Sequence, residues 1–425
     1  MRVDWPRGLE RIQLWCVVVF AAVLPVGKSP AEVALGVGVA VWLARTVLVH
    51  RRPIIPSNPL TIWLIAWFLI GLVSISNSVD IGTSLRGLQK LVKHFAWYLV
   101  VIDAVRSSAA LRRVVWGVLA GLGVLIADTW WQAAVGWDLF YGNPPTTALE
   151  GAVRRLQGPF DHPASLAIHL VTFLPVLFAW TSQGLPTRQR RVWWVLGGGG
   201  LLALVFSWNR GGFAGLLIGL AVLAIGLRRW APLIIAAATA ALQVLLLPPA
   251  VKTWAAGMPS LLHQFTQPER LMIWQTAWGM IRAHPILGVG INAFAQTYPA
   301  YATPEAQYGS VGPYAHNLYL HMAAELGVAG LVILVGIVAR LVWGAVRQLR
   351  EHAGSGPDAV IGAGFVAGLA GYLTVGLVES SLYYGRGSLT FWLLVGLLVA
   401  WERLMGGASD ATVTSADPEG RGATH

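Results

Sequence analysis

Charged side chains and cysteine are both scarce in this sequence. Asp, Glu, Lys and Arg make up only 12% of the 425 residues, about half of their share in soluble proteins. Hydrophobic residues account for 56%, and the mean hydropathy is +0.62. Cys16 is the single cysteine, so an internal disulfide and a cysteine-based metal site are excluded. The composition excludes a soluble globule and predicts an integral membrane protein.

Patterns typical of metal, nucleotide and nucleic-acid sites are missing as well. There is no Asp-x-Asp pair for Mg²⁺, no His/Cys/Glu cluster with zinc spacing and no Walker loop. The formal charge of +11 comes from Lys and Arg residues scattered singly between apolar runs, which argues against a nucleic-acid partner. We predict no metal and no cofactor, so arginines would have to neutralise any phosphate charge.

Long apolar runs fill most of the chain. A membrane-spanning helix needs about 20 mostly apolar residues, and the sequence contains room for many of them. We predict an all-α polytopic membrane protein with about twelve transmembrane helices. The expected spans are 12–27, 31–49, 60–77, 84–103, 111–134, 162–181, 192–207, 211–227, 231–249, 316–346, 358–378 and 387–404.

Arginine clusters recur at every second connection between these spans, as in 45–52, 106–113 and 188–191. The positive-inside rule therefore places both termini in the cytoplasm. We predict one transmembrane domain, residues 1–405, which includes a large periplasmic loop, 250–315, between the ninth and tenth spans. Residues 406–425 are small and polar and are expected to form a disordered cytoplasmic tail.

The periplasmic loop is expected to contain a helix. Apolar residues recur at helical spacing from Pro268 to Arg282, with Leu271, Trp274, Trp278 and Ile281 on one face. An amphipathic helix rich in tryptophan is expected to lie on the membrane surface.

Several arginines face outward in this topology, where the rule predicts few cations. Arg154 and Arg155 precede His162 and the sixth span, Arg210 lies in a short turn, and Arg270 begins the predicted surface helix. Separated guanidinium groups at one lipid–water boundary suit a lipid headgroup with two phosphates, because each can pair bidentately with phosphate oxygens. Alternatively, each arginine only reaches to phospholipid phosphates. The glycines after Arg210, Gly211 and Gly212, favour a site, because missing side chains let a ligand approach the backbone.

Three further cations share one face of the fourth span. Arg86, Lys90 and Lys93 stand at i, i+4 and i+7. Cations in such a row usually line the bundle interior or a watery cavity, so a basic groove for a lipid-linked phosphate is one interpretation. Charge pairing with Asp128 or another buried acid is the other.

A polar pair, His316-Asn317, stands where the chain re-enters the membrane pattern. An imidazole can accept a proton at neutral pH, and neighbouring arginines would favour its neutral form. His316 is therefore the candidate base, unless it only bonds a loop carbonyl. Glu325 falls on the opposite side of an ideal helix from His316, and Gly327 with Gly330 is expected to serve helix packing.

Taken in order, these motifs resemble those of the O-antigen ligase family, within the O-antigen ligase/polymerase superfamily of membrane glycosyltransferases. The resemblance extends over essentially the whole chain. The matching motifs are Arg155-x-x-Gly158-Pro159-Phe160-x-His162-Pro163, Ser207-x-x-Arg210-Gly211-Gly212, Arg270 with His284-Pro285-x-x-Gly288-x-Gly290, and His316-Asn317-x-x-Leu320 with Glu325-x-Gly327-x-x-Gly330.

The resemblance implies a membrane glycosyltransferase of the C class at the periplasmic face of the bacterial inner membrane. Its reaction would transfer a polysaccharide from undecaprenyl pyrophosphate to a sugar hydroxyl of lipid A–core oligosaccharide, completing lipopolysaccharide, with inversion and without metal. His316 would take the proton of the acceptor hydroxyl, and Arg155, Arg210 and Arg270 would hold the pyrophosphate. Candidates for secondary contacts are Asn317, Arg154, His162, Arg86, Lys90 and Lys93.

Three alternatives remain open at this point. An O-antigen polymerase would use the same donor with a lipid-linked sugar as acceptor. A protein O-oligosaccharyltransferase usually carries a larger periplasmic C-terminal portion, which the short tail argues against. A non-catalytic flippase or exporter of anionic lipids could use a basic groove but would not need a base at His316.

Overall fold

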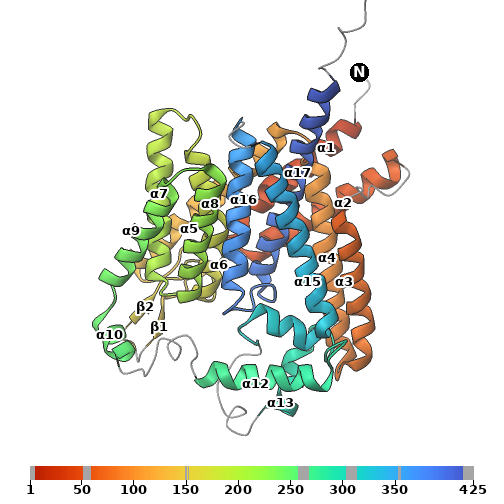
Figure 1. Cartoon of the computed structure of the whole chain (residues 1–425), viewed down its shortest axis with the longest axis vertical. Helices are drawn as coiled ribbons and strands as arrows, with labels where there is room; N and C mark the ends of the chain where they lie inside the picture. The colour runs from red at the N-terminus through yellow and green to blue at the C-terminus, as the bar shows by residue number, and fades with distance from the viewer. Residues whose placement is uncertain are drawn as a thin grey trace, which may run out of the picture.

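The fold is a bundle of long helices with shorter helices across one end (Figure 1). The computed structural model describes residues 5–50, 59–148, 151, 153–256, 268–302, 314–352 and 356–414. The long helices are α1 (Trp5–Val23), α2 (Lys28–Arg45), α3 (Pro59–Ser74), α4 (Ile81–Ala104), α5 (Ser108–Val135), α6 (Pro163–Thr181), α7 (Thr187–Phe206), α8 (Arg210–Leu227), α9 (Ala231–Leu245), α15 (Leu318–Glu351), α16 (Gly356–Val375) and α17 (Gly385–Thr414). The short elements are α10 (Pro249–Ala256), α12 (Pro268–Ala283), α13 (Phe294–Tyr301), the antiparallel pair β1 (Thr146–Ala148) and β2 (Val153–Arg155), a π-helical turn Thr46–His50 and a 3₁₀ turn Ile75–Asn77.

Each of the twelve expected spans falls on one of these long helices. Eight helices among the described residues are long and apolar enough to cross a membrane, so the chain is a multi-pass membrane protein. Helices α1, α4 and α7 carry more charged residues, and α9 is shorter. Twelve crossings therefore stay a prediction.

Two boundaries differ from expectation in ways that matter. Helix α15 begins at Leu318, so His316 and Asn317 precede the helix instead of forming its first turn. Helix α17 runs on to Thr414, into the segment expected to be a disordered tail, and residues 415–425 lie outside the described residues. In the loop 250–315, residues 257–267 and 303–313 are likewise outside them.

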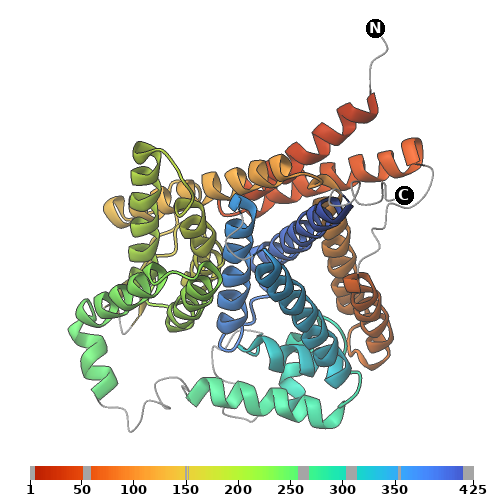
Figure 2. The same ribbon diagram turned by 45° about the horizontal axis from the view of Figure 1, so that its top comes forward.

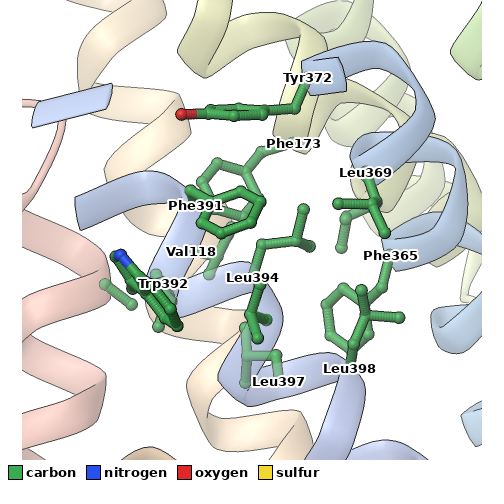
Figure 3. Close-up of a cluster of buried hydrophobic side chains, with 14 of the residues drawn as sticks. Val118, Phe173, Phe365, Leu369, Tyr372, Phe391, Trp392, Leu394, Leu397 and Leu398 are labelled. Atoms are coloured by element: carbon green, nitrogen blue, oxygen red, sulfur yellow. The ribbon is translucent and has the colours of Figure 1, made fainter. Parts of the chain in front are cut away.

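The core lies around α17, which contacts α4, α6 and α16. Large side chains fill it, among them Phe173, Tyr372, Phe391 and Trp392, each about 1% exposed or less (Figure 3). The outer faces of the bundle instead expose apolar side chains such as Ile62, Val195 and Ile225. Apolar side chains thus fill the core and also cover the outer faces of the bundle, as expected for a protein surrounded by lipid.

Helix α12 lies across one end of the bundle, as Figures 1 and 2 both show. The helix itself is confirmed, and besides the predicted apolar face it has a second one, which is buried. Ile273, Ala277 and Met280 are buried on the side that meets α15, whereas Leu271 and Trp278 are exposed. The exposed pair remains available to meet the membrane surface.

Helix α15 is broken at Gly327, where the backbone has φ 65° and ψ −169°. The segment after α12 fits into this break. The amides of Val289 and Gly290 donate to the carbonyls of Ala324 and Glu325 on one side, and the Val328 amide donates to the Pro285 carbonyl on the other. Gly327 therefore has a structural role, but of a different kind from the expected packing between two helices. Gly327 and Gly288 permit an interlock, in which the backbone of the loop 285–290 bonds to the backbone of α15 at 324–328.

We expect Gly327→Ala to destabilise the protein. Its backbone conformation is one that essentially only glycine adopts, which costs about 1–3 kcal/mol for other residues. A Cβ at Gly327 would also lie 2.2 Å from the carbonyl oxygen of Ile286. Thermal unfolding in detergent measures the loss. Gly198→Ala is the control, since a Cβ there meets nothing within 4 Å, and equal melting temperatures for the two variants would contradict the interlock.

Candidate functional site

Glu379, in the connection between α16 and α17, is the centre of a cluster of polar side chains. Its carboxylate is 3.4 Å from Nδ1 of His316 and 3.5 Å from Nη2 of Arg270, and it accepts a 2.7 Å hydrogen bond from the Tyr384 hydroxyl. The Glu379 side chain is 5% exposed, whereas His316 and Arg270 are about a quarter exposed. A buried carboxylate thus holds two cationic or polar side chains that still reach solvent.

The charge of Glu379 is maintained by these neighbours. Burial alone raises the pKa of this carboxyl group, but the hydrogen bond from His316, the charge of Arg270 and the Tyr384 hydroxyl outweigh it, so the pKa is lowered. Burial and the neighbouring carboxylate raise the pKa of Tyr384, so its hydroxyl keeps the proton that it donates. Because a carboxylate can only accept, Nδ1 of His316 is the donor, which leaves Nε2 to accept a proton.

The loop of His316 is held firmly from both sides. His316 has a left-handed backbone with φ 47°, a conformation that persists only where the surroundings enforce it. Asn317 caps α15 by accepting from the amides of Tyr319 and Leu320, and the Leu318 amide donates to the Gly376 carbonyl. Asn317 therefore positions His316 through the backbone.

His321 is buried and has a structural role. Its Nδ1 accepts from the Ala315 amide at 3.2 Å, and its Nε2 is 3.4 Å from Glu325. Glu325 also accepts from the amides of Asn292 and Phe294. These bonds connect the loop of His316 to the segment between α12 and α13, whose backbone bonds to α15 at the break.

Arg155 and Arg210 approach the same cluster from the other side. The Nε of Arg155 donates to the Ser207 carbonyl at 3.0 Å, which joins β2 to the end of α7. Burial lowers the pKa of the Arg155 guanidinium; Glu379 opposes this effect and the charges of Arg210 and Arg270 add to it. Arg155 therefore lies within electrostatic range of Glu379 and of the other two arginines, and Arg210 lies within range of Arg270.

The two glycines after Arg210 have a different role from the one expected. A Cβ at Gly211 would lie 2.3 Å from Val378, and a Cβ at Gly212 would lie 2.6 Å from Ala167. Protein atoms occupy the space that was expected to admit a ligand. The glycines let α8 begin tightly against Val378, whose carbonyl accepts a 3.0 Å bond from Arg270.

Of the other two candidates near α6, His162 lies close to the Glu379 cluster and Arg154 does not. His162 caps α6 through its Nδ1; burial lowers its pKa, and Glu379, Arg155, His316 and Arg270 are the charges that act on it. Arg154 is exposed and points to the opposite face of β2 from Arg155.

The cations of α4 make their described contacts away from the Glu379 cluster. Arg86 donates to Thr83, and Lys90 is 3.3 Å from Asn292. Lys93 forms a 2.7 Å ion pair with Glu32.

Sequence reasoning missed Glu379. The available signal was a lone carboxylate between two apolar helices, seven residues before Arg386 in the first turn of α17. Arg386 donates to the Pro159 carbonyl at 2.6 Å and lies 4.0 Å from the ring centroid of Phe160, so it anchors the loop after β2. Among the described residues, no group of three or more His, Cys, Asp or Glu side chains could hold a metal ion.

An imidazole oriented by a carboxylate, together with fixed guanidinium groups, can remove a proton beside an anionic group. A comparison with curated proteins found no match. Residues 195–335 match the protein-family model described as O-antigen ligase. This segment includes Arg210, Arg270, His316 and the interlock of α15. The match covers this segment and supports membership of the O-antigen ligase family.

Proposed function

We propose that this protein transfers a polysaccharide from undecaprenyl pyrophosphate to a sugar hydroxyl of lipid A–core oligosaccharide at the periplasmic face of the bacterial inner membrane. The observation that carries the proposal is the shared contact of His316 and Arg270 with one buried carboxylate, Glu379. A base and a phosphate-binding cation would be held at a fixed separation by this contact. Such preorganisation is what a transfer between two bound lipids requires.

In this reaction Nε2 of His316 accepts the proton of the acceptor hydroxyl as its oxygen attacks the anomeric carbon. The new glycosidic bond forms while the bond from the anomeric carbon to the pyrophosphate oxygen breaks, so the configuration inverts. Undecaprenyl pyrophosphate leaves with the electron pair. Arg155, Arg210 and Arg270 stabilise its growing charge, so the leaving group needs no proton.

The experiment is a transfer assay with purified protein, lipid-linked polysaccharide and lipid A–core oligosaccharide. We expect a joined product that forms in the presence of a metal chelator. A polymerase would instead extend a lipid-linked acceptor, so a parallel reaction with two lipid-linked glycans separates the two activities. Absence of both products, in a protein shown to bind the donor, would contradict glycosyl transfer.

We expect Glu379→Gln to lower the transfer rate by at least about 10–100-fold, by analogy with the loss of carboxylates that orient metal-binding histidines. The amide no longer requires Nδ1 of His316 to be the donor, so Nε2 is less often the basic nitrogen. Loss of the negative charge also disfavours the imidazolium, so the acid limb of the pH–rate profile should move to lower pH.

Steady-state rates between pH 5 and 9 measure both effects. Glu351→Gln is the matched control, because Glu351 is exposed and pairs with Arg347 on the same helix as the His316 loop. A reduced rate with an unchanged pH profile would show that Glu379 only supports the fold.

A further inference from the structure

A basic cavity of about 300 Å³ lies at the end of the bundle opposite to Glu379. The starts of α1 and α5 and the ends of α2 and α4 surround it. The other end of α4 lies near the interlock, where the Asn292 side chain donates to the Thr83 carbonyl. The lining includes five arginines, which are Arg7, Arg11, Arg45, Arg106 and Arg113.

Arg45 forms the floor of this cavity and is 2% exposed. It pairs with Asp103 at 2.6 Å and with Glu10 at 2.8 Å. Arg106 pairs with the same two carboxylates. These are the two acidic side chains of the described lining, which holds five arginines in all.

The geometry of the cavity also suits an anion. Helix α5 begins in its wall, where Ser107 caps the first turn, and the start of a helix favours negative charge. Arginines bind phosphate oxygens bidentately, and the volume matches that of a small ligand site. Arginines that only reach toward surrounding headgroups need neither a cavity nor a buried charged residue such as Arg45 in its lining.

Apolar side chains beside the cavity indicate which source of phosphate it would take. Ile12 and Trp15 on α1 are about half exposed, as are Leu43 and, further along, Val47 beyond the end of α2. Acyl chains can lie against these residues while a headgroup occupies the cavity. We propose that this cavity binds the phosphate headgroup of an anionic phospholipid in the leaflet opposite to the candidate active site. Basic pockets between transmembrane helices serve this purpose in other membrane proteins.

The test measures lipid binding and does not depend on glycosyl transfer. Delipidated protein in detergent is titrated with phosphatidylglycerol, cardiolipin or phosphatidylcholine, and bound lipids are counted by native mass spectrometry. We expect the wild type to prefer the two anionic lipids. Arg11→Gln/Arg113→Gln should weaken their binding by roughly 30-fold, since each cation near the surface contributes about 1 kcal/mol.

The matched control is Arg188→Gln/Arg190→Gln, which removes the same charge from the start of α7, outside the cavity. It should bind anionic lipid like the wild type. Neither variant touches the carboxylate pairs of Arg45, and circular dichroism checks that both are folded. Equal weakening in the two variants, or unchanged binding in Arg11→Gln/Arg113→Gln, would overturn the proposal. Complete competition by millimolar inorganic phosphate would also overturn it, because the acyl chains would then contribute nothing.

Discussion

The His316→Ala variant is expected to transfer polysaccharide about 10²–10⁴-fold more slowly than the wild type, the usual contribution of a general base. The imidazole is replaced by a methyl group, so no basic nitrogen accepts the proton of the acceptor hydroxyl. Binding of the lipid-linked donor should be nearly unchanged, because the three arginines remain. Transfer rates and donor affinity, measured on the same preparation, separate the two effects.

His352→Ala is the control for this experiment, because His352 lies at the far end of α15 and its Nδ1 contacts only the Gln348 carbonyl among the described contacts. It should transfer at the wild-type rate. A His316→Ala protein that transfers normally would refute the role of His316 as base. A normal rate would also favour the view that the imidazole only anchors its loop.

The Arg270→Ala variant is expected to lose about 10²–10³-fold in transfer rate, comparable to the loss of one donor that stabilises a developing anion. Arg270 can offer its remaining N–H groups to phosphate while it donates to the Val378 carbonyl and pairs with Glu379. Arg270→Lys keeps the charge but not the planar fork, so its rate should fall between those of the wild type and the alanine variant.

Arg282→Ala provides the comparison on the same helix. Arg282 is exposed and lies 5.6 Å from the ring centroid of Trp278, so its loss should leave transfer unchanged. A similar decrease in both variants would mean that the positive charge of α12 acts as a whole. Wild-type activity in Arg270→Ala would exclude this residue from the pyrophosphate site.

Much of the fold could be predicted because lipid imposes strict requirements on a chain. Backbone groups in a bilayer must bond within their own helix, so apolar runs of sufficient length coincide with α1–α9 and α15–α17. Cations that break the positive-inside pattern are costly unless they are used. For this reason the pattern of charges along the chain is enough to select Arg155, Arg210 and Arg270 as candidates.

The roles of the glycines and of Glu379 could not be predicted in the same way. Both depend on which residues from distant parts of the chain lie beside them in the fold. The lack of a side chain serves different purposes at the two positions. At Gly211 it leaves room for the Val378 side chain, and at Gly327 it permits the backbone conformation at which the loop bonds to α15. Spacing along one helix likewise did not reveal which face of α12 packs against the bundle. Its buried residues are those that meet α15.

The sequence by itself determined that this chain crosses a membrane repeatedly and that arginines and an imidazole lie near the ends of its long helices. Only the tertiary structure decided that His316 and Arg270 share Glu379, which is 63 residues from His316 in the chain. Helix formation follows from local hydrophobicity and backbone bonding, whereas the partner of a buried charge depends on how distant helices are packed.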